Sequence, residues 1–276
     1  HSLGVVRDAL IALDRQAQPD DGRLYWNMPV VLETFDGLLS DINGFHVKPE
    51  HVAEAQRNAV GGPVTEGAVG GGSGMICHEF KGGIGTSSRQ LSKAQGGWTV
   101  GAIVQANHGI RNELRVDGYP VGRYMEQADS PFLRASLPYP GMGSIVVCLA
   151  TDAPLLPHQC TRLAQRASLG LARTGGGNED HSGDIFIAFA TGNQHVPPAA
   201  YEGKGAPTCN NLSMVNNDHI SELFLAATEA VEEAIINAVL AAETTEGNGH
   251  TVPGLDAKTL LKALRQAGWP GETVGI

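Results

Sequence analysis

Several features that would place this chain in a familiar class of protein are missing from its 276 residues. It has no run of basic residues and a formal net charge of −10, which argues against a nucleic-acid partner. No apolar run reaches the roughly 18 residues of a membrane-spanning helix. Its 4 cysteines form no C-x-x-C pair and are too scattered for a disulfide scaffold. We therefore expect a globular protein without nucleic-acid or membrane partners, located in the cytoplasm, with the periplasm as the alternative.

Nucleotide-binding motifs are also absent, although one segment is rich in glycine. Neither G-x-x-x-x-G-K-[ST] nor G-x-G-x-x-G occurs in residues 61–85, where 10 of 25 residues are glycine. Apolar residues such as Val69, Ile76 and Phe80 alternate with the glycines, unlike in a flexible linker. Such glycine density is typical of positive φ or of a backbone that passes close to another group. We expect a core turn or an oxyanion-binding loop, with backbone donors at Gly71, Gly72 and Gly74.

The hydrophobic pattern predicts a mixed α+β protein without internal repeats or a regular β-helix-β alternation. Apolar runs bounded by glycine or polar residues predict strands at 29–35, 99–107, 143–151 and 183–191. Helical periodicity predicts helices at 50–60, 155–172, 219–242 and 257–267.

The helix at 219–242 has the clearest periodicity. We expect Asp218 to be its N-cap. One face carries eight apolar residues: Ile220, Leu223, Phe224, Ala227, Val231, Ile235, Ala238 and Val239. The long loop 193–218 precedes this helix, and a structureless loop of that length is usually functional or disordered.

An acidic segment at 179–184 resembles a metal-binding cluster in composition only. It contains Glu179, Asp180, His181 and Asp184. Neighbouring residues on one loop rarely point at the same ion, and no helical ligand spacing supports a site. We therefore predict no metal and no cofactor.

Five segments of the chain resemble one family of enzymes. They are PVVLETFDGLLSDINGFHV (29–47), PVTEGAVGGGSGMICHEFKGGIGTSSR (63–89), GGWTVGAIVQANHG (96–109), HSGDIFIAFATGN (181–193) and ATEAVEEAIINAVLAAETTEGNGHTV (227–252). They closely resemble the DmpA-type aminopeptidases, a group of self-cleaving serine hydrolases that includes L-aminopeptidase/D-amino-acid esterases and β-peptidyl aminopeptidases. The similarity runs from His1 to about Val252 in one order.

The resemblance implies an architecture and a processing step. The fold would be a four-layer αββα sandwich, in which two stacked β-sheets are flanked by helices. Residues 1–276 would form one domain, cleaved between Leu212 and Ser213 into fragments 1–212 and 213–276. The family also implies a homo-oligomer, a tetramer, and a further segment upstream of His1.

Ser213 is the candidate nucleophile that the resemblance selects. By itself it is one polar loop serine among many, but family members cleave themselves before a serine just upstream of a motif like MVNND-x-I-x-x-LF. Thr208 and Cys209 are weaker candidates. The freed α-amino group, with an ordinary pKa near ~7.7–8.0, would serve as general base, so no histidine would be required.

The resemblance also implies partners for this serine. Asn107 and His108 occupy positions where the family has an oxyanion site, although the family has tyrosine at the second of them. A satisfied loop histidine is the equal alternative for His108, and otherwise imidazole would donate to an oxyanion or titrate near neutral pH. Asp180 fits the place of a family asparagine and Thr251 that of a hydroxyl residue. Pro253 stands where the family has glutamate.

Three functions follow from these observations. The first is an N-terminal-serine aminopeptidase or amidase acting on small peptides, amino-acid amides or esters, including those of D- or β-amino acids. The second is an uncleaved binding or structural member of the same fold. The third is an acyltransferase on the related fold, for which the threonine motif of such enzymes is not visible.

Overall fold

The computed structural model describes residues 1–20, 25–127, 130, 143–196 and 206–271. Its centre is one four-stranded sheet, in the order β3 (Gly83–Gln90), β4 (Thr99–Asn107), β5 (Ser144–Thr151) and β6 (Ile185–Ala190). The first three strands are antiparallel, and β6 runs parallel to β5. In β4 the buried residues alternate with more exposed ones, as expected for a strand with one face in the core.

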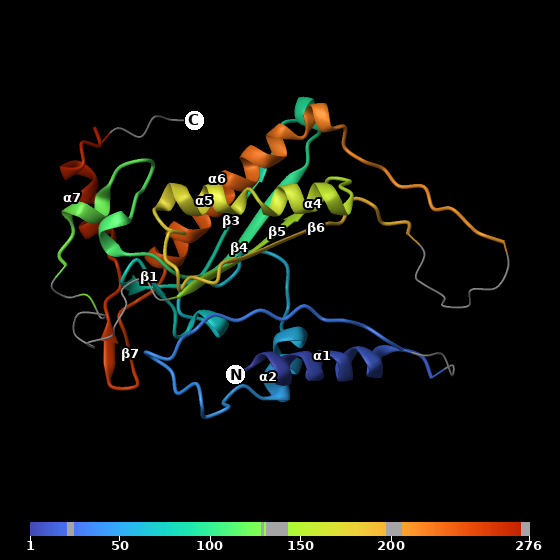
Figure 1. The fold of residues 1–276 in the computed structure, drawn as a ribbon, viewed down its shortest axis with the longest axis horizontal. Helices are drawn as coiled ribbons and strands as arrows, with labels where there is room; N and C mark the ends of the chain where they lie inside the picture. The colour runs from blue at the N-terminus through green and yellow to red at the C-terminus, as the bar shows by residue number, and fades with distance from the viewer. Residues whose placement is uncertain (21–24, 128–129, 131–142, 197–205, 272–276) are drawn as a thin grey trace.

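Three helices cover one face of this sheet, as Figure 1 shows. They are α4 (Pro157–Ala164), α5 (Ala167–Thr174) and the 20-residue α6 (Ser221–Leu240). Helix α6 packs on β3 and β4 and contributes fully buried residues such as Leu223, Val231 and Ile235. The main core therefore lies between α6 and the sheet.

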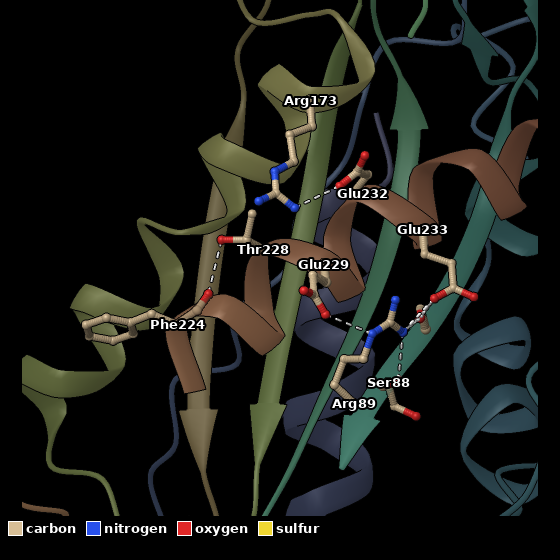
Figure 2. A network of polar contacts seen from close by, with 9 residues as sticks. Ser88, Arg89, Arg173, Phe224, Thr228, Glu229, Glu232 and Glu233 are labelled. Atoms are coloured by element: carbon tan, nitrogen blue, oxygen red, sulfur yellow. Dashed lines mark hydrogen bonds and ion pairs between the residues drawn. The ribbon is translucent and has the colours of Figure 1, made fainter. Parts of the chain in front are cut away.

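Charged side chains fix the two sides of α6. Arg89 of β3 donates to Glu233 over 2.6 Å and to Glu229 over 3.2 Å. On the other side Arg173 of α5 donates to Glu232 over 3.0 Å (Figure 2). Half-exposed ion pairs of this kind contribute little free energy individually. Their positions on opposite sides of α6 help to set its rotation on the sheet.

The opposite face of the sheet presents apolar side chains to solvent. Ile103, Ile185 and Phe189 are 40%, 42% and 49% exposed. Ile103 pairs with Cys148 and Cys148 with Ile187, so the apolar residues form a continuous patch across three strands. We refer to this patch as the open face.

Smaller elements surround one end of the sheet. Strands β1 (Ile76–Cys77) and β2 (Phe80–Lys81) form one hairpin, and β7 (Thr245–Gly247) and β8 (His250–Val252) form another. Leu38, Leu39, Ile76 and Val252 join these hairpins in a second, small core. The other α-helices of the described residues are α1 (Leu3–Ala17), α2 (Pro49–Arg57) and α7 (Ala257–Gln266). Short 3₁₀ segments are η1 (Gly70–Gly72), η2 (Lys93–Gln95), η3 (Arg111–Glu113), η4 (Val121–Tyr124) and η5 (Asn217–His219).

Most of the predicted elements are confirmed. The strands predicted at 99–107, 143–151 and 183–191 correspond to β4, β5 and β6. All eight residues of the predicted apolar face of 219–242 are buried. The helices predicted at 50–60 and 257–267 correspond to α2 and α7, and Asp256 begins α7 by accepting from Thr259 N over 2.9 Å. Within the described ranges, no helix combines the length and the apolarity that crossing a membrane requires.

Three expectations about secondary structure were wrong, and two elements were missed. Residues 29–35 form no strand, and Val30 and Phe35 are exposed. The helix predicted at 155–172 is two helices, separated at Gln165–Arg166. Asp218 lies in η5 and α6 begins after Ile220, so Asp218 is not its cap. Helix α1 and the glycine-containing strand β3 were not predicted.

Candidate active site

Asn107 ends β4 with both polar atoms of its amide engaged. Its Oδ1 accepts from Ile76 N over 2.7 Å, and its Nδ2 donates to Phe35 O over 2.8 Å. The side chain is 3% exposed. Asn107 therefore ties β4 to the β1–β2 hairpin and to the segment after α1. The contact with Phe35 uses one of the two Nδ2 hydrogens.

His108 lies beneath the surface, next to a second histidine. It is 1% exposed, and its ring centroid is 5.2 Å from that of His78. Burial, with a smaller contribution from His78, lowers the pKa of His108 well below its ordinary value. Of the alternatives left open for His108, titration near neutral pH does not fit this burial, because the buried imidazole stays neutral there. A fully satisfied histidine does not fit either, since His108 Nε2 is buried without a hydrogen-bond partner.

His78 and Glu79 form the turn of the β1–β2 hairpin. Their φ values of 50° and 62° lie in the left-handed region, which non-glycine residues seldom adopt. Such φ values suit a two-residue hairpin turn, where Asn-Gly is the common choice. Both side chains are buried, and burial lowers the pKa of His78 to about 4. Strained, buried ionisable residues of this kind are concentrated at functional sites.

The glycine-rich segment forms a core turn around a buried lysine. Lys81 Nζ donates to Gly72 O, Met75 O and Gly82 O over 2.9, 2.9 and 2.7 Å. These three carbonyls match the three hydrogens of an ammonium group. Burial nevertheless lowers the pKa of Lys81 to about 8. Lys81 is therefore charged at neutral pH, because a pKa of about 8 lies above 7 and three carbonyls accept its hydrogens.

The glycines predicted to be oxyanion donors have structural contacts. Gly72 N donates to Val69 O over 2.8 Å, so this amide is used within η1. A side chain on Gly72 would meet Gly67 O at 2.6 Å, and one on Gly74 would meet the Asp36 side chain at 2.7 Å. One on Gly71 would meet the Gln105 side chain at 2.1 Å. Close packing is the first reason for these glycines.

Two further predicted segments lie at the same end of the sheet as Asn107. Gly183 N donates to Ser144 Oγ over 2.9 Å, and Ser144 pairs with Asn107. Asp180 precedes this contact and is exposed. Thr251 is exposed on β8, whose next residue, Val252, packs with Ile76. Asn107, His108 and the segments that carry Asp180 and Thr251 are thus gathered at one end of the sheet.

Ser213 lies at the other end of the sheet in the unbroken chain. Its N donates to Asn193 Oδ1 over 2.8 Å, and Asn193 Nδ2 donates to its carbonyl over 3.0 Å. Two residues on, Val215 N donates to Pro154 O over 3.0 Å. Pro154 and Asn193 follow the C-terminal ends of β5 and β6, whereas Asn107 pairs with the first residue of β5. Because β5 has 8 residues, the two ends are about 23 Å apart at ~3.3 Å per residue.

Sequence reasoning missed one group of candidate ligands. Within the parts of the chain that the structure describes, Cys77, His78 and His108 are the residues whose ligand atoms all lie within 4.8 Å of one another. The acidic segment 179–184 does not form such a group there. A cysteine and histidine adjacent in the sequence, with a second histidine 30 residues later, gave no recognisable ligand spacing.

Comparison with known proteins identifies the family. The model of peptidase family S58 matches residues 1–252. A β-peptidyl aminopeptidase, BapA of Sphingosinicella microcystinivorans, is 45% identical over 96% of this chain and 68% of its own length. The solved β-aminopeptidase of a Burkholderia species is 62% identical, with a TM-score of 0.90, over 98% of this chain and 72% of its own.

A second solved structure defines the fold. The L-aminopeptidase D-Ala-esterase/amidase of Ochrobactrum anthropi is described as a variant of the Ntn hydrolase fold. It is 45% identical, with a TM-score of 0.84, over 97% of this chain and 72% of its own. The fold and its neighbours therefore define a hydrolase of the Ntn class. This chain belongs to peptidase family S58 and is an aminopeptidase, which confirms the resemblance seen in the sequence.

The buried histidines predict acid sensitivity of the fold. His78 has a folded pKa of about 4, below its unfolded value of 6.5, so between these pH values the unfolded chain binds a proton that the folded chain does not. Stability should fall as the pH decreases through this window, by on the order of 3 kcal/mol. In denaturant unfolding, the free energy of unfolding of His78→Phe should decrease less between pH 6.5 and pH 4 than that of the native protein. The same substitution at the exposed His158 is the matched control, and equal slopes in all three proteins would contradict the assignment.

Proposed function

We propose that this aminopeptidase releases N-terminal residues from small peptides, amino-acid amides and esters, β-amino acids included. The observation that carries the proposal is the continuous match to family S58 from residue 1 to 252. Its relatives are a β-peptidyl aminopeptidase, a β-aminopeptidase and an L-aminopeptidase D-Ala-esterase/amidase. Their common chemistry is attack on a carbonyl that follows a free amino group. Hydrolysis of β-alanyl and L-alanyl amides by the purified protein tests this directly.

The peptide bond between Leu212 and Ser213 is suited to self-cleavage. Leu212 is 50% exposed, Ser213 is exposed, and residues 206–216 form no helix or strand. In the proposed step Ser213 Oγ attacks the Leu212 carbonyl carbon, the C–N bond breaks, and the hydroxyl proton passes to the departing nitrogen. Water then hydrolyses the Leu212–Oγ ester, which leaves a carboxylate on Leu212 and a free hydroxyl and amine on Ser213.

The same residue then serves as nucleophile and base. The free Ser213 amine takes the proton of its own hydroxyl as Oγ attacks the substrate carbonyl. That proton goes to the leaving amine, and water releases the acyl group from Oγ. An α-amino group has an ordinary pKa near ~7.7–8.0, so it is substantially neutral around pH 8 and able to accept a proton.

Removing the Ser213 hydroxyl should prevent processing. Ser213→Ala should remain one unbroken chain by intact mass, whereas the native protein should give fragments that separate at residue 213. Thr208→Ala, a nearby hydroxyl on the same loop, is the matched control and should be cleaved normally. Cleavage of the Ser213→Ala protein at this bond would exclude Ser213, and an unbroken native chain would favour the non-cleaving alternative.

The family arrangement requires Ser213 to meet Asn107, His108, Asp180 and Thr251. We propose that the segment beginning at Ser213 seats along β6 for this purpose. Strand β6 is the last of the described sheet, and a groove of about 490 Å³ runs between it and α4. Ile220, 1% exposed, fixes the start of α6. The seven residues back to Ser213 reach about 23 Å when extended, which equals the length of β5.

Moving the segment from its described position to β6 loses and gains similar amounts of free energy. Val215 is 5% exposed, and its carbonyl accepts from Gln159 Nε2 over 2.8 Å. Removing it loses roughly 1.5–3 kcal/mol of burial and two hydrogen bonds of roughly 0.5–1.5 kcal/mol each. A strand added to β6 gains ladder hydrogen bonds and covers the groove. The two positions of Ser213 can therefore interconvert at modest cost.

Asn193 distinguishes the two positions, since it binds Ser213 only in the described one. If seating along β6 produces the active site, Asn193→Ala should process at least as fast as the native chain. Asp180→Ala should then process more slowly. Intact mass against time measures both rates, and hydrogen exchange at residues 185–190 should slow when the segment is seated. A folded Asn193→Ala protein that no longer cleaves would instead make Asn193 the working partner of Ser213.

The exposed apolar residues of the open face are evidence for the second sheet of the proposed four-layer arrangement. We propose that a β-sheet covers Ile103, Ile185 and Phe189, because a patch of this kind is otherwise unusual on a soluble protein. The homo-tetramer and the cytoplasmic location stay predictions.

Covering this face should make Phe189 behave as a core residue. In the mature enzyme Phe189→Ala should lower the free energy of unfolding by about 3–5 kcal/mol. Phe45→Ala is the control, since Phe45 is 60% exposed and lies outside the sheet. Denaturant unfolding compares the two, and equal small losses would mean that the face is uncovered.

A further inference from the structure

We propose that Cys77, His78 and His108 form a binding site for a single soft, monovalent metal ion, Cu(I). Their ligand atoms lie within 4.8 Å of one another, and all three side chains are buried. The Cys77 Sγ to His108 Nδ1 distance is 3.9 Å. One sulfur and two imidazole nitrogens are suited to a soft transition metal, with the thiolate as the ligand that selects Cu(I).

Unsatisfied nitrogen atoms give independent support for a ligand here. His78 Nε2 and His108 Nε2 are both buried without a hydrogen-bond partner. His108 faces Cys77 Sγ with its Nδ1, so the unpaired Nε2 of His78 is the atom that points to a ligand at this site. His78 Nδ1 lies 3.2 Å from Ile110 O, where it donates its hydrogen and leaves the Nε2 lone pair free. A backbone carbonyl on the second ring nitrogen is the usual partner of a metal-binding histidine.

The backbone around the rings is built closely to their shape. A Cβ on Gly109 would lie 2.6 Å from His78 Nδ1, so only glycine leaves room for this ring. The chain also holds His78 at a φ of 50°. The position of the His78 ring is thus fixed by its own backbone conformation and by the close approach of Gly109.

Charge balance favours Cu(I) over Zn(II). The ammonium of Lys81 and the guanidinium of Arg111 are both close to the β1–β2 hairpin: Arg111 Nη2 donates to Glu79 O over 2.6 Å. The buried Glu79 carboxylate, whose Oε1 accepts from Arg111 N over 3.4 Å, offsets one of these two cations. A thiolate with Cu(I) is neutral, whereas a thiolate with Zn(II) adds a positive charge to a buried region that is already net positive. Zn(II) also prefers four ligands, and the described residues bring three together here.

Binding exchanges one ion for one proton. The Cys77 S–H bond breaks, the S–Cu bond forms, the thiol proton leaves to solvent, and the oxidation state of copper does not change. The ion would join the β1–β2 hairpin to the residue after β4. We expect it to stabilise this end of the sheet, and the proposal does not depend on Ser213 or on cleavage.

The experiment uses a protein in which Cys77 is the only thiol. The full chain with Cys148→Ser, Cys160→Ser and Cys209→Ser is titrated anaerobically with Cu(I) against a competing chelator. We expect one equivalent to bind, Tm to rise, and X-ray absorption to show one sulfur and two nitrogen neighbours. Adding Cys77→Ser should remove the binding and the Tm increase. His78→Phe should weaken binding at least tenfold, and circular dichroism confirms that each variant is folded.

Three results would overturn the proposal. A folded protein that binds no Cu(I) excludes the site, and binding that survives Cys77→Ser places the ion elsewhere. Preferential binding of Zn(II), followed with Co(II) as the spectroscopic probe, would refute the assignment to Cu(I).

Discussion

The structure depends on the close approach of strand β3 to helix α6. A Cβ on Gly85 would lie 1.9 Å from the carbonyl oxygen of Ala234, so any larger residue would push the helix away from the sheet. The facing side of α6 is rich in small residues: Ala226, Ala227, Ala230, Ala234 and Ala238 are all buried. Close backbone packing of this kind depends on dispersion contacts that weaken steeply with distance. A second glycine, Gly170, brings α5 close to α6, where a Cβ would lie 2.7 Å from the carbonyl oxygen of Thr228.

The same constraint reaches the candidate active site through the start of β3. Gly83 lies against Gly67, where a Cβ would meet the carbonyl oxygen at 2.0 Å. Lys81, two residues earlier, gathers three carbonyls of the glycine-rich turn. Asn107 then ties the end of β4 to the β1–β2 hairpin. The helix contact, the glycine turn and the polar residues near β4 are therefore one continuous piece of packing.

The sequence predicted the elements whose periodicity reflects burial on one face. Strand β4 and helix α6 were found because alternation and 3.6-residue periodicity survive tertiary packing. Strand β3 was missed because its glycines make close backbone contacts, Gly85 with α6 and Gly83 with Gly67, and carry no hydrophobic signal. Residues 29–35 have strand composition but no strand partner among the described residues, and hydrogen bonds through Thr34 and Phe35 hold them instead. The pairing of His78 with His108 joins positions 30 residues apart, which no local pattern encodes.

The location of Ser213 is decided by small differences in burial. In the described position Val215 is buried, while Leu212 and Met214 are 50% and 45% exposed. Seating the segment that begins at Ser213 along β6, as proposed, would reverse part of this pattern of burial. Val215 leaves its contact, and the groove beside Phe186 and Ala188 can receive Met214. Burying one Leu or Met side chain contributes roughly 1.5–3 kcal/mol, the same range as the loss of Val215. A sheet over the open face would enclose Phe189 and deepen the groove, so it favours the seated position. In the proposed seating, the approach of Ser213 to Asn107 would therefore be coupled to the covering of the open face, because the same layer would complete the core and favour the seated position of Ser213.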